Sequence, residues 1–315
     1  MVSFIVIGRN EGWRLEKCFK GIYVFVEAEK IVDYEVIYVD SKSTDGSVEL
    51  SKKFNNTKTL LITGECNAAI ARNIGAKEAS GEILFFLDGD MELIPGFWSS
   101  VVKEGKMVYP FMSGLENNFW HDSDWNYVNS SINRKYTEGV DSYEVTTGGL
   151  FVIEAELWKK AGGMDNRCKR SQDLDFGFKL TKIGCRLCRK PQEWVNHYTR
   201  YYQARSDSSA FVKYTAFLTR KHFFEPFAQK FMFGVNYSLW ILFFSFLLMF
   251  CYTSLIPSAL YFLAVILRAF RTHKKIDTKI GILSLVVGQI KNDFSFIYYF
   301  ICFRPPMVPL EYELR

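Results

Sequence analysis

Short apolar runs alternate with segments of helical spacing over the first hundred residues of the chain. The runs predict four strands, and the spacing between them predicts three helices. The predicted strands are Ser3–Ile7, Tyr34–Val39, Thr59–Ile62 and Ile83–Leu87, and the predicted helices are Gly12–Ala28, Ser47–Phe54 and Ala68–Ala79. This alternation predicts an α/β fold, Rossmann-like, with a mostly parallel sheet, right-handed crossovers and helices on both faces.

The pattern loosens between Pro95 and Val145, where polar and aromatic stretches have no clear period. We expect a substrate-facing insertion there. Regular patterning resumes with a strand ending at Ile153, a helix from about Ala155 to Ala161, and a second helix that begins at Gln172 with acidic residues in its first turn. Acidic residues at that position complement the helix dipole.

The C-terminal third carries the apolar excess of the chain. The sequence is 17% aromatic with 29 Phe, and no charged residue occurs from Phe231 to Leu267. Pro257 splits this stretch, which predicts a helical hairpin at about 233–270 with helices at about 233–251 and 255–270 and basic residues at both outer ends. A third apolar segment, about 280–303, is interrupted by two charges and is predicted to be interfacial or a poorer span. The alternative is a buried helical hairpin in a soluble protein.

These patterns divide the chain into three predicted parts. They are a catalytic domain over 1–205, a basic and aromatic interfacial segment over 206–230, and a C-terminal membrane region over 231–315. The apolar C-terminal region predicts a location at the cell membrane. The chain enters a strand at once, without a signal-peptide pattern, so we expect the catalytic domain to be cytoplasmic. The net charge of +5 is modest and partly gathered beside the apolar segment, which favours a membrane over nucleic acid as partner.

Cysteines give no strong signal. The seven are scattered, and a reducing compartment would keep them as thiols. Cys185 and Cys188 form one Cys-x-x-Cys pair with Cys168 as a possible third ligand, so a zinc site is the lesser alternative.

Three acidic clusters carry candidate chemistry. Asp88-Gly89-Asp90 follows the apolar strand Ile83–Leu87, at the carboxyl end where ligand sites of α/β sheets lie. Two carboxylates at this spacing suit Mg²⁺ or Mn²⁺ that also binds a diphosphate. Asp40 with Asp45 follows the second strand, and Asp173 with Asp175 begins a predicted helix. Each cluster alone is equally compatible with a surface turn or a helix cap.

Taken together with the strand order, the clusters resemble the inverting glycosyltransferases of family 2, which have a GT-A fold. The resemblance covers about Val2 to Tyr202 and rests on several separate motifs. They are the strand and turn ending in Asn10-Glu11, the segment Val39-Asp40-Ser41-Lys42-Ser43-Thr44-Asp45-Gly46-Ser47, Ala71-Arg72-Asn73-Ile74-Gly75, Asp88-Gly89-Asp90, Gly148-Gly149, Gly162-Gly163-Met164-Asp165 and Gln172-Asp173.

The resemblance implies a role for each matching residue. Asp173 would be the catalytic base, and Asp90, Asp88 and His197 would hold Mg²⁺ or Mn²⁺, although His197 is as well explained as a structural residue. The residues implied to bind the nucleotide sugar, with a UDP-sugar favoured, are Ile7, Asn10, Glu11, Asp40, Arg72, Asp88, Gly148 and Gly149. A bound cation would stabilise the departing diphosphate, and a carboxylate would take the proton of the attacking hydroxyl.

The sequence therefore predicts an inverting, metal-dependent glycosyltransferase. It would move a single sugar to a hydroxyl of a glycan acceptor linked to a polyprenyl lipid carrier, in polysaccharide or glycoconjugate biosynthesis. The chain lacks the Gln-x-x-Arg-Trp motif of processive synthases, which favours single transfer. One alternative is a polyprenyl-phosphate glycosyltransferase, whose acceptor is already ionised. Another is a non-enzymatic nucleotide-sugar-binding subunit of a membrane assembly complex.

Overall fold

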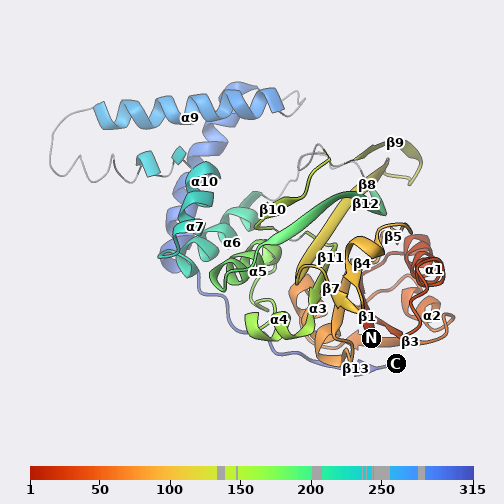
Figure 1. The fold of residues 1–315 in the computed structure, drawn as a ribbon. Helices are drawn as coiled ribbons and strands as arrows, with labels where there is room; N and C mark the ends of the chain where they lie inside the picture. The colour runs from red at the N-terminus through yellow and green to blue at the C-terminus, as the bar shows by residue number, and fades with distance from the viewer. Residues whose placement is uncertain are drawn as a thin grey trace. The chain divides into compact units, whose positions relative to one another are not determined.

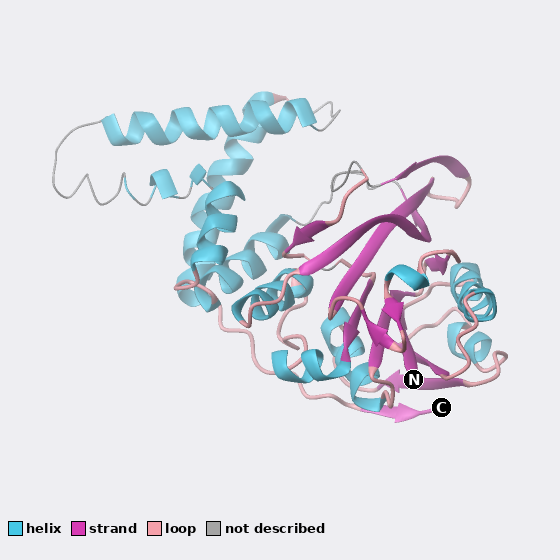
Figure 2. Cartoon of the chain, viewed as in Figure 1, coloured by secondary structure: helices cyan, strands magenta, loops and turns pink. Residues whose placement is uncertain are grey.

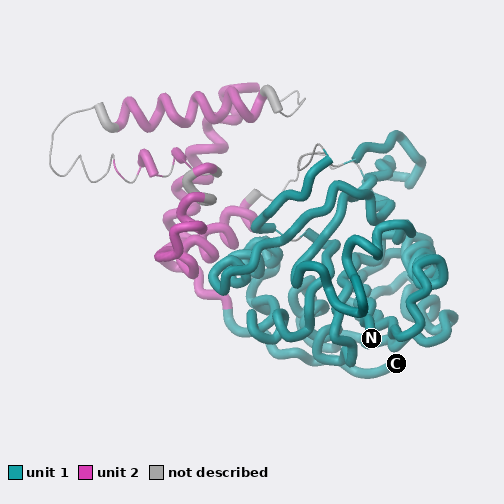
Figure 3. Tube along the Cα trace, viewed as in Figure 1, with its two compact units in different colours: residues 1–204, 306–315 teal, residues 205–305 magenta. Residues whose placement is uncertain are grey.

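A computed structural model describes residues 1–132, 139–146, 148–200, 208–235, 237–238, 240–242, 244, 256–275 and 281–315. The chain forms two compact units, shown in different colours in Figure 3. Unit 1 comprises residues 1–204 and 306–315, and unit 2 comprises residues 205–305. Strands gather in unit 1, whereas the described part of unit 2 is helical (Figure 2).

Four parallel strands form the first half of the unit 1 sheet (Figure 1). They lie in the order β4-β1-β2-β3. Their bounds are β1 Val2–Gly8, β2 Tyr34–Asp40, β3 Thr57–Ile62 and β4 Ile83–Asp88. Each strand agrees with a predicted one to within two residues, so the parallel half of the predicted sheet is confirmed.

Helices cover both faces of this half, because alternate residues of each strand point to opposite sides. Val2, Phe4 and Val6 of β1 pack in the same cluster as the buried face of α1 (Trp13–Ala28). Ile5 and Ile7 pack on the other face, in a cluster with α3 (Ala68–Glu78), α4 (Ala155–Ala161) and α5 (Gln172–Lys182). The short helix α2 (Ser47–Ser51) completes the set that the sequence predicted.

The second half of the sheet is not parallel throughout. The strand β11 (Phe151–Glu154) runs antiparallel to β4 and to β8 (Phe111–His121), and β12 (Leu187–Arg200) runs parallel to β8. The remaining short elements are β5 Met91–Leu93, η1 Trp98–Ser100, β6 Val102–Lys103, β7 Lys106–Met107, β9 Tyr127–Ile132 and β10 Ser142–Glu144. The sheet is therefore mixed, and the predicted mostly parallel sheet holds only for its first half.

The region predicted as a loosened insertion contains the long strand β8. Its first five residues are buried, but its second half mixes buried and half-buried positions without alternation. Polar side chains there face the site instead of solvent, which removes the period of two that identifies a strand in a sequence.

The last ten residues return to unit 1, where β13 (Tyr312–Leu314) pairs antiparallel with β3 at the edge of the sheet. These residues were predicted to belong to the C-terminal membrane region. Edge pairing is made by backbone groups, so a three-residue strand leaves little trace in side-chain patterning.

Unit 2 contains α6 (Ser208–Lys221), α7 (Pro226–Val235), α9 (Ile256–Lys275) and α10 (Ile282–Cys302). Within the described ranges, none of these helices combines the length and apolar character that crossing a bilayer requires. The prediction of C-terminal membrane helices is therefore wrong. Arg268 and Arg271 interrupt α9, and Lys291-Asn292-Asp293 interrupts α10. The first predicted helix of the hairpin, about 233–251, lies largely outside the described residues.

A buried polar cluster explains the charge in the middle of α10. The Asp293 side chain accepts hydrogen bonds from Ser238 Oγ at 2.9 Å and from Gln289 Nε2 at 2.8 Å, and Arg268 Nη1 lies 3.6 Å away. Asp293 is only 1% exposed. A buried carboxylate needs such partners, so this part of α10 is built for helix–helix contact.

Candidate active site

The acidic pair Asp88 and Asp90 lies at the carboxyl end of β4, as predicted. Register places Asp88 beside Ile7 of β1, and places Asp40 of β2 beside Gly8. The Gly89 N–H donates to the Ile7 carbonyl at 2.8 Å, which turns the chain sharply between the two carboxylates. The strand order thus gathers acidic side chains from two strand ends at one edge of the sheet.

Arg72 faces Asp88 from α3. Its Nη2 atom donates to Asp88 Oδ1 at 2.5 Å, and the residue is 2% exposed. Its Nε and Nη1 atoms are also buried, and among the described residues neither has a hydrogen-bond partner. Unsatisfied buried donors are costly, so this guanidinium is suited to receive anionic oxygens from a ligand.

The pairing of two neighbouring strands brings His197 close to Asp90. The strand β12 pairs with β5, which sets His197 opposite Met91, and the Tyr198 N–H donates to the Asp90 carbonyl at 2.9 Å. His197 Nε2 lies 3.4 Å from Asp90 Oδ2, and its Nδ1 lies 2.8 Å from Asn118 Oδ1. The predicted proximity of His197 to the acidic pair is therefore present in the fold.

Arg14 reaches the same carboxylate from the first turn of α1. Its Nη1 atom lies 3.3 Å from Asp90 Oδ2, and its Nη2 atom lies 2.6 Å from Glu11 Oε2. The Trp125 ring packs 4.2 Å from the Arg14 guanidinium carbon. Arg14 was not among the residues expected from the sequence, although its spacing of three residues from Glu11 at a helix start was a usable signal.

Crowded charges shift the pKa values of the cluster. Burial, with the charge of Asp90, raises the pKa of Glu11 to about 7. Burial opposes the charging of His197, but its contact with Asp90 and the nearby charge of Glu116 raise its pKa to about 9. Burial also raises the pKa of Asp88 despite the adjacent Arg72. Perturbed groups gathered in one place are typical of functional sites.

A divalent cation fits this donor set. Asp90 Oδ1 is buried and accepts no hydrogen bond from any residue that the structure describes. Carboxylate oxygens with one imidazole nitrogen suit Mg²⁺ or Mn²⁺. Asp90 and His197 are the residues best placed to hold the cation, whereas Asp88 is directed to Arg72.

The nucleotide-side residues lie along the adjacent strand ends. Asp40 is fully buried and accepts from the Tyr38 hydroxyl and the Ser43 N–H, both at 2.8 Å. Asn10, with a φ of 57°, receives the Thr44 N–H on its Oδ1 atom at 2.7 Å. These hydrogen bonds hold the loop after β2, so in this structure Asp40 and Asn10 stabilise the loop conformation. The buried Ile7 contributes its backbone carbonyl to Gly89.

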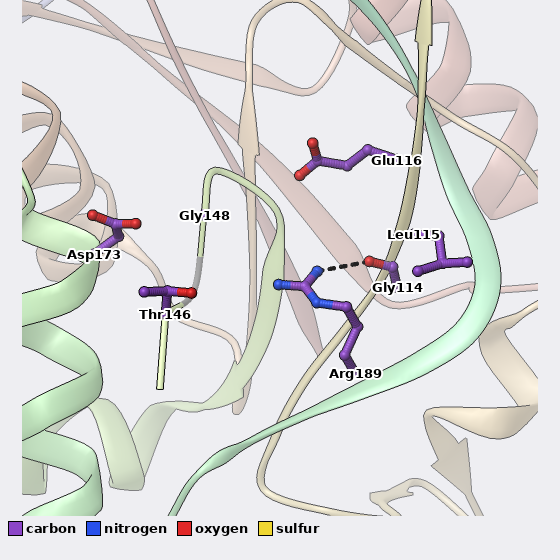
Figure 4. A pocket seen from close by; sticks show the side chains of 7 residues that line it. All are labelled: Gly114, Leu115, Glu116, Thr146, Gly148, Asp173 and Arg189. Atoms are coloured by element: carbon purple, nitrogen blue, oxygen red, sulfur yellow. Dashed lines mark hydrogen bonds between the residues drawn. The ribbon is translucent and has the colours of Figure 1, made fainter. Parts of the chain in front are cut away.

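A cavity of about 230 Å³ is lined by residues of β8, β12, α5 and the glycine loop (Figure 4). It reaches the acidic cluster through Glu116, whose Oε2 atom lies 3.8 Å from His197 Nδ1. Asp173 lines one side from the first turn of α5, and Glu116 of β8 lines another. The other described lining residues are Gly114, Leu115, Thr146, Gly148 and Arg189. Asp173 and Gly148 thus line the same cavity. Glu116 and Arg189 were missed because they lie on the strands whose pattern was irregular.

Gly149 lies directly against Asp88. A Cβ atom built on Gly149 would fall 2.1 Å from Asp88 Oδ2. No real Cβ contact is that short, so a glycine is required here for the Asp88 carboxylate to keep its place.

The cysteine pair is not part of this site. Cys185 and Cys188 are buried separately, near Tyr109 and Asp141. Among the described residues, Cys168 instead groups with Asp165 and Asp175, their ligand atoms lying within 4.8 Å of one another. Asp165 also receives a forked hydrogen bond from Arg167. The Cys-x-x-Cys pair and Cys168 therefore do not form the zinc site considered as an alternative.

The α/β fold is of the GT-A type, with an acidic cluster at the carboxyl ends of its parallel strands. Residues 3–107 match the model of the family described as Glycosyl transferase family 2. The matched residues contain both the Asn10-Glu11 turn and the acidic pair.

Similar proteins point the same way. The chain is 24% identical over 233 residues to a Probable N-acetylgalactosaminyltransferase 7 of Caenorhabditis elegans, covering 63% of this chain and 39% of that protein. It is 26% identical over 224 residues to an Uncharacterized glycosyltransferase of Haemophilus influenzae, covering 65% of this chain and 72% of that protein. A crystal structure of GalNAc-T7 with UDP, GalNAc and Mn²⁺ superimposes with a TM-score of 0.58 at 18% identity, covering 76% of this chain and 50% of that one.

The superposition supports the predicted GT-A fold, and the relatives support the prediction of a glycosyltransferase. The chain spans well under half of the first relative and half of the solved chain. Their substrates therefore belong to those proteins.

We expect Gly149→Ala to abolish binding of a nucleotide sugar while leaving the protein folded. The new methyl group forces Asp88 away from Arg72, and overpacking of this kind costs about 1–3 kcal/mol. Isothermal titration with UDP and Mg²⁺, with thermal unfolding in parallel, measures both effects. Gly288→Ala in α10 is the matched control, since its Cβ meets nothing within 4 Å. Wild-type UDP affinity in Gly149→Ala would contradict the placement.

Stability of the metal-free protein should fall as pH rises from about 6 to 9. The folded-state pKa of His197 is raised to about 9 from 6.5, so its stabilisation is complete below 6.5 and is lost as pH rises through 9. The pKa of Glu11 is raised from 4.5 to about 7, so Glu11 also lowers stability as pH rises, but mainly between about pH 4.5 and 7. The His197 shift corresponds to on the order of 3 kcal/mol. Urea unfolding in EDTA measures the change, and His197→Gln should flatten it; an equal slope in both proteins would refute the assignment.

Proposed function

We propose that this protein transfers a single sugar from a nucleotide diphosphate sugar, with UDP favoured as the nucleotide, to a hydroxyl of a glycan acceptor. The transfer inverts the anomeric centre and depends on Mg²⁺ or Mn²⁺. One observation carries the proposal: the Asp88, Asp90 and His197 cluster adjoins a cavity with Asp173 on its wall. The residues suited to a cation thus lie next to the cavity that the candidate base Asp173 lines.

The chain's own residues divide the work. Arg72 offers its unsatisfied N–H groups to diphosphate oxygens, where negative charge grows as the sugar departs. In the cavity, the acceptor hydroxyl attacks the anomeric carbon and gives its proton to the Asp173 carboxylate. The bond from the anomeric carbon to the diphosphate breaks, and its electron pair leaves with the nucleotide. A single displacement of this kind inverts the anomeric configuration.

Asp90 and His197 would hold the cation. When bound, it supplies Lewis-acid stabilisation of charge on the leaving diphosphate. Arg14 compensates the charges of the Asp90 and Glu11 carboxylates in the metal-free protein, with a hydrogen bond to Asp90 and an ion pair to Glu11. Glu11 and Arg14 therefore position the donor side of the site.

The choice of UDP and a divalent metal follows the relatives. One is named a probable N-acetylgalactosaminyltransferase, and the solved chain with the GT-A fold holds UDP, GalNAc and Mn²⁺. The predicted polyprenyl carrier depended on membrane helices that the described residues do not contain. We therefore propose a glycan hydroxyl as the acceptor group and assign no lipid carrier.

A panel of nucleotide sugars tests the function. UDP-, GDP- and dTDP-sugars are incubated with the full chain and Mn²⁺, and nucleotide release is measured with and without EDTA. We expect one UDP-sugar to be turned over, with the released or transferred sugar inverted by NMR. Failure of every donor to bind or react would refute the proposal, whereas tight donor binding without turnover would favour a nucleotide-sugar-binding subunit.

A further inference from the structure

The cavity beside Asp173 has an unusual charge balance for a site that would take a phosphate. Two carboxylates line it, those of Asp173 and Glu116. Arg189 is the one cationic side chain among its described lining residues. Whether the Arg189 guanidinium is available to an anion therefore bears on which acceptors the described walls of the cavity can receive.

Arg189 is occupied by the protein itself. Its Nε atom donates to both Glu144 carboxylate oxygens, at 3.1 and 3.0 Å. Its Nη1 atom donates to Ser113 Oγ at 3.0 Å and to the Gly114 carbonyl at 2.8 Å, the latter bond drawn in Figure 4. The side chains of Arg189 and Glu144 are about one-tenth exposed. Because Glu144 and Arg189 form a buried pair, little of the positive charge of this guanidinium is left to offset the charges of Asp173 and Glu116.

Glu116 is placed to contact a ligand in this cavity. Its carboxylate is 19% exposed, and the Cβ position of Gly148 lies 3.8 Å from Oε1, so no side chain separates Glu116 from the glycine loop. Its other oxygen lies 3.8 Å from His197 Nδ1. Glu116 thus borders both the acceptor cavity and the metal-side cluster. A carboxylate in that position accepts hydrogen bonds from sugar hydroxyls and repels anions.

We propose that this cavity binds an uncharged, hydroxyl-bearing sugar ring, that Glu116 is a binding residue for it, and that phosphate-bearing acceptors are excluded. The inference rests on the proposed function and names the acceptor class for the same site. A volume of about 230 Å³ suits one ring, since sites for drug-sized ligands begin near 300 Å³. A polyprenyl phosphate would place its anion against Asp173 and Glu116 with no unpaired cation offered by the described walls.

Binding can be measured without turnover. The full chain with UDP and Mg²⁺ is titrated with methyl glycosides of glucose, galactose and N-acetylglucosamine, and with the 6-phosphates of the same sugars, by saturation-transfer NMR. Prenyl phosphate is added as the lipid-phosphate probe. We expect at least one methyl glycoside to bind at millimolar concentration, and every phosphate to bind at least tenfold more weakly.

Two variants test the role of Glu116. Glu116→Gln should weaken glycoside binding three- to tenfold, and Glu116→Lys should admit the phosphates. Glu156→Gln, an exposed carboxylate of α4, is the matched control and should change nothing. If Glu116→Lys fails to fold, as judged by thermal unfolding, the Gln variant decides. Phosphate binding equal to or tighter than glycoside binding in the wild type, or no glycoside binding, would overturn the inference. A failed donor panel with intact glycoside binding would refute the proposed function alone.

Discussion

Asp90→Asn is expected to lower metal-dependent donor turnover about a thousandfold. Asp90 Oδ1 is buried without a hydrogen-bond partner among the described residues, while its Oδ2 faces His197 and Arg14. The substitution keeps the shape of the side chain and removes the charge that would hold a divalent cation. Removing a single hydrogen-bond donor that stabilises charge in a transition state lowers the rate by about 10²–10³. A bound cation stabilises more charge than one such donor, so its loss lowers the rate at least as much.

The measurement is nucleotide release against Mn²⁺ concentration for the donor found in the panel. We expect the metal concentration at half-maximal rate to rise, together with the loss of kcat. Asp33→Asn, which changes a largely exposed carboxylate, is the control. Folding should be retained, because the substitution also removes one of several crowded negative charges. A rate within threefold of wild type at saturating Mn²⁺ would show that the cation is held elsewhere.

Asp173→Asn should lower sugar transfer by about 10²–10⁴-fold with little change in UDP affinity. General-base catalysis is worth about that much, and Asp173 is the candidate base that lines the acceptor cavity. UDP affinity is spared because Asp173 lies on α5, whereas Arg72, Asp88 and Asp90 belong to the donor side.

Transfer to the glycoside that binds, compared with UDP binding by titration, separates the two effects. Asp124→Asn, an exposed carboxylate in the turn after β8, is the matched control. An Asp173→Asn protein that keeps most of its transfer activity would point to an acceptor that is already ionised. That result would contradict both the base role and the uncharged acceptor.

The hydrophobic pattern of the sequence predicts strands and helices best where one full face of the element is buried. The four parallel strands and three helices at the N-terminus were predicted to within a few residues because each is buried along a full face. In β8 the pattern failed, since Glu116 lies on a strand whose polar residues face a cavity. The same failure concealed Glu116, and Arg189 on β12 was missed with it.

The C-terminal error has a related cause. An uncharged run from Phe231 to Leu267 indicates burial but not what buries it. In α10, Asp293 is satisfied by Ser238 and Gln289 from the same unit, so protein contacts account for a charge that hydropathy alone treats as an interruption. Side-chain partners of this kind can be found only in the folded unit.

The sequence by itself determined the α/β order of the first hundred residues, the place of Asp88 and Asp90 at a strand end, and the start of a helix at Gln172-Asp173. These depend on local periodicity and on chain connectivity. Only the tertiary structure decided that His197 meets Asp90, that Gly149 lies on Asp88, and that Glu144 neutralises Arg189 beside the cavity. Those relations join residues 45 to 107 positions apart, and they exist because hydrogen bonds across a mixed sheet bring distant strand ends together.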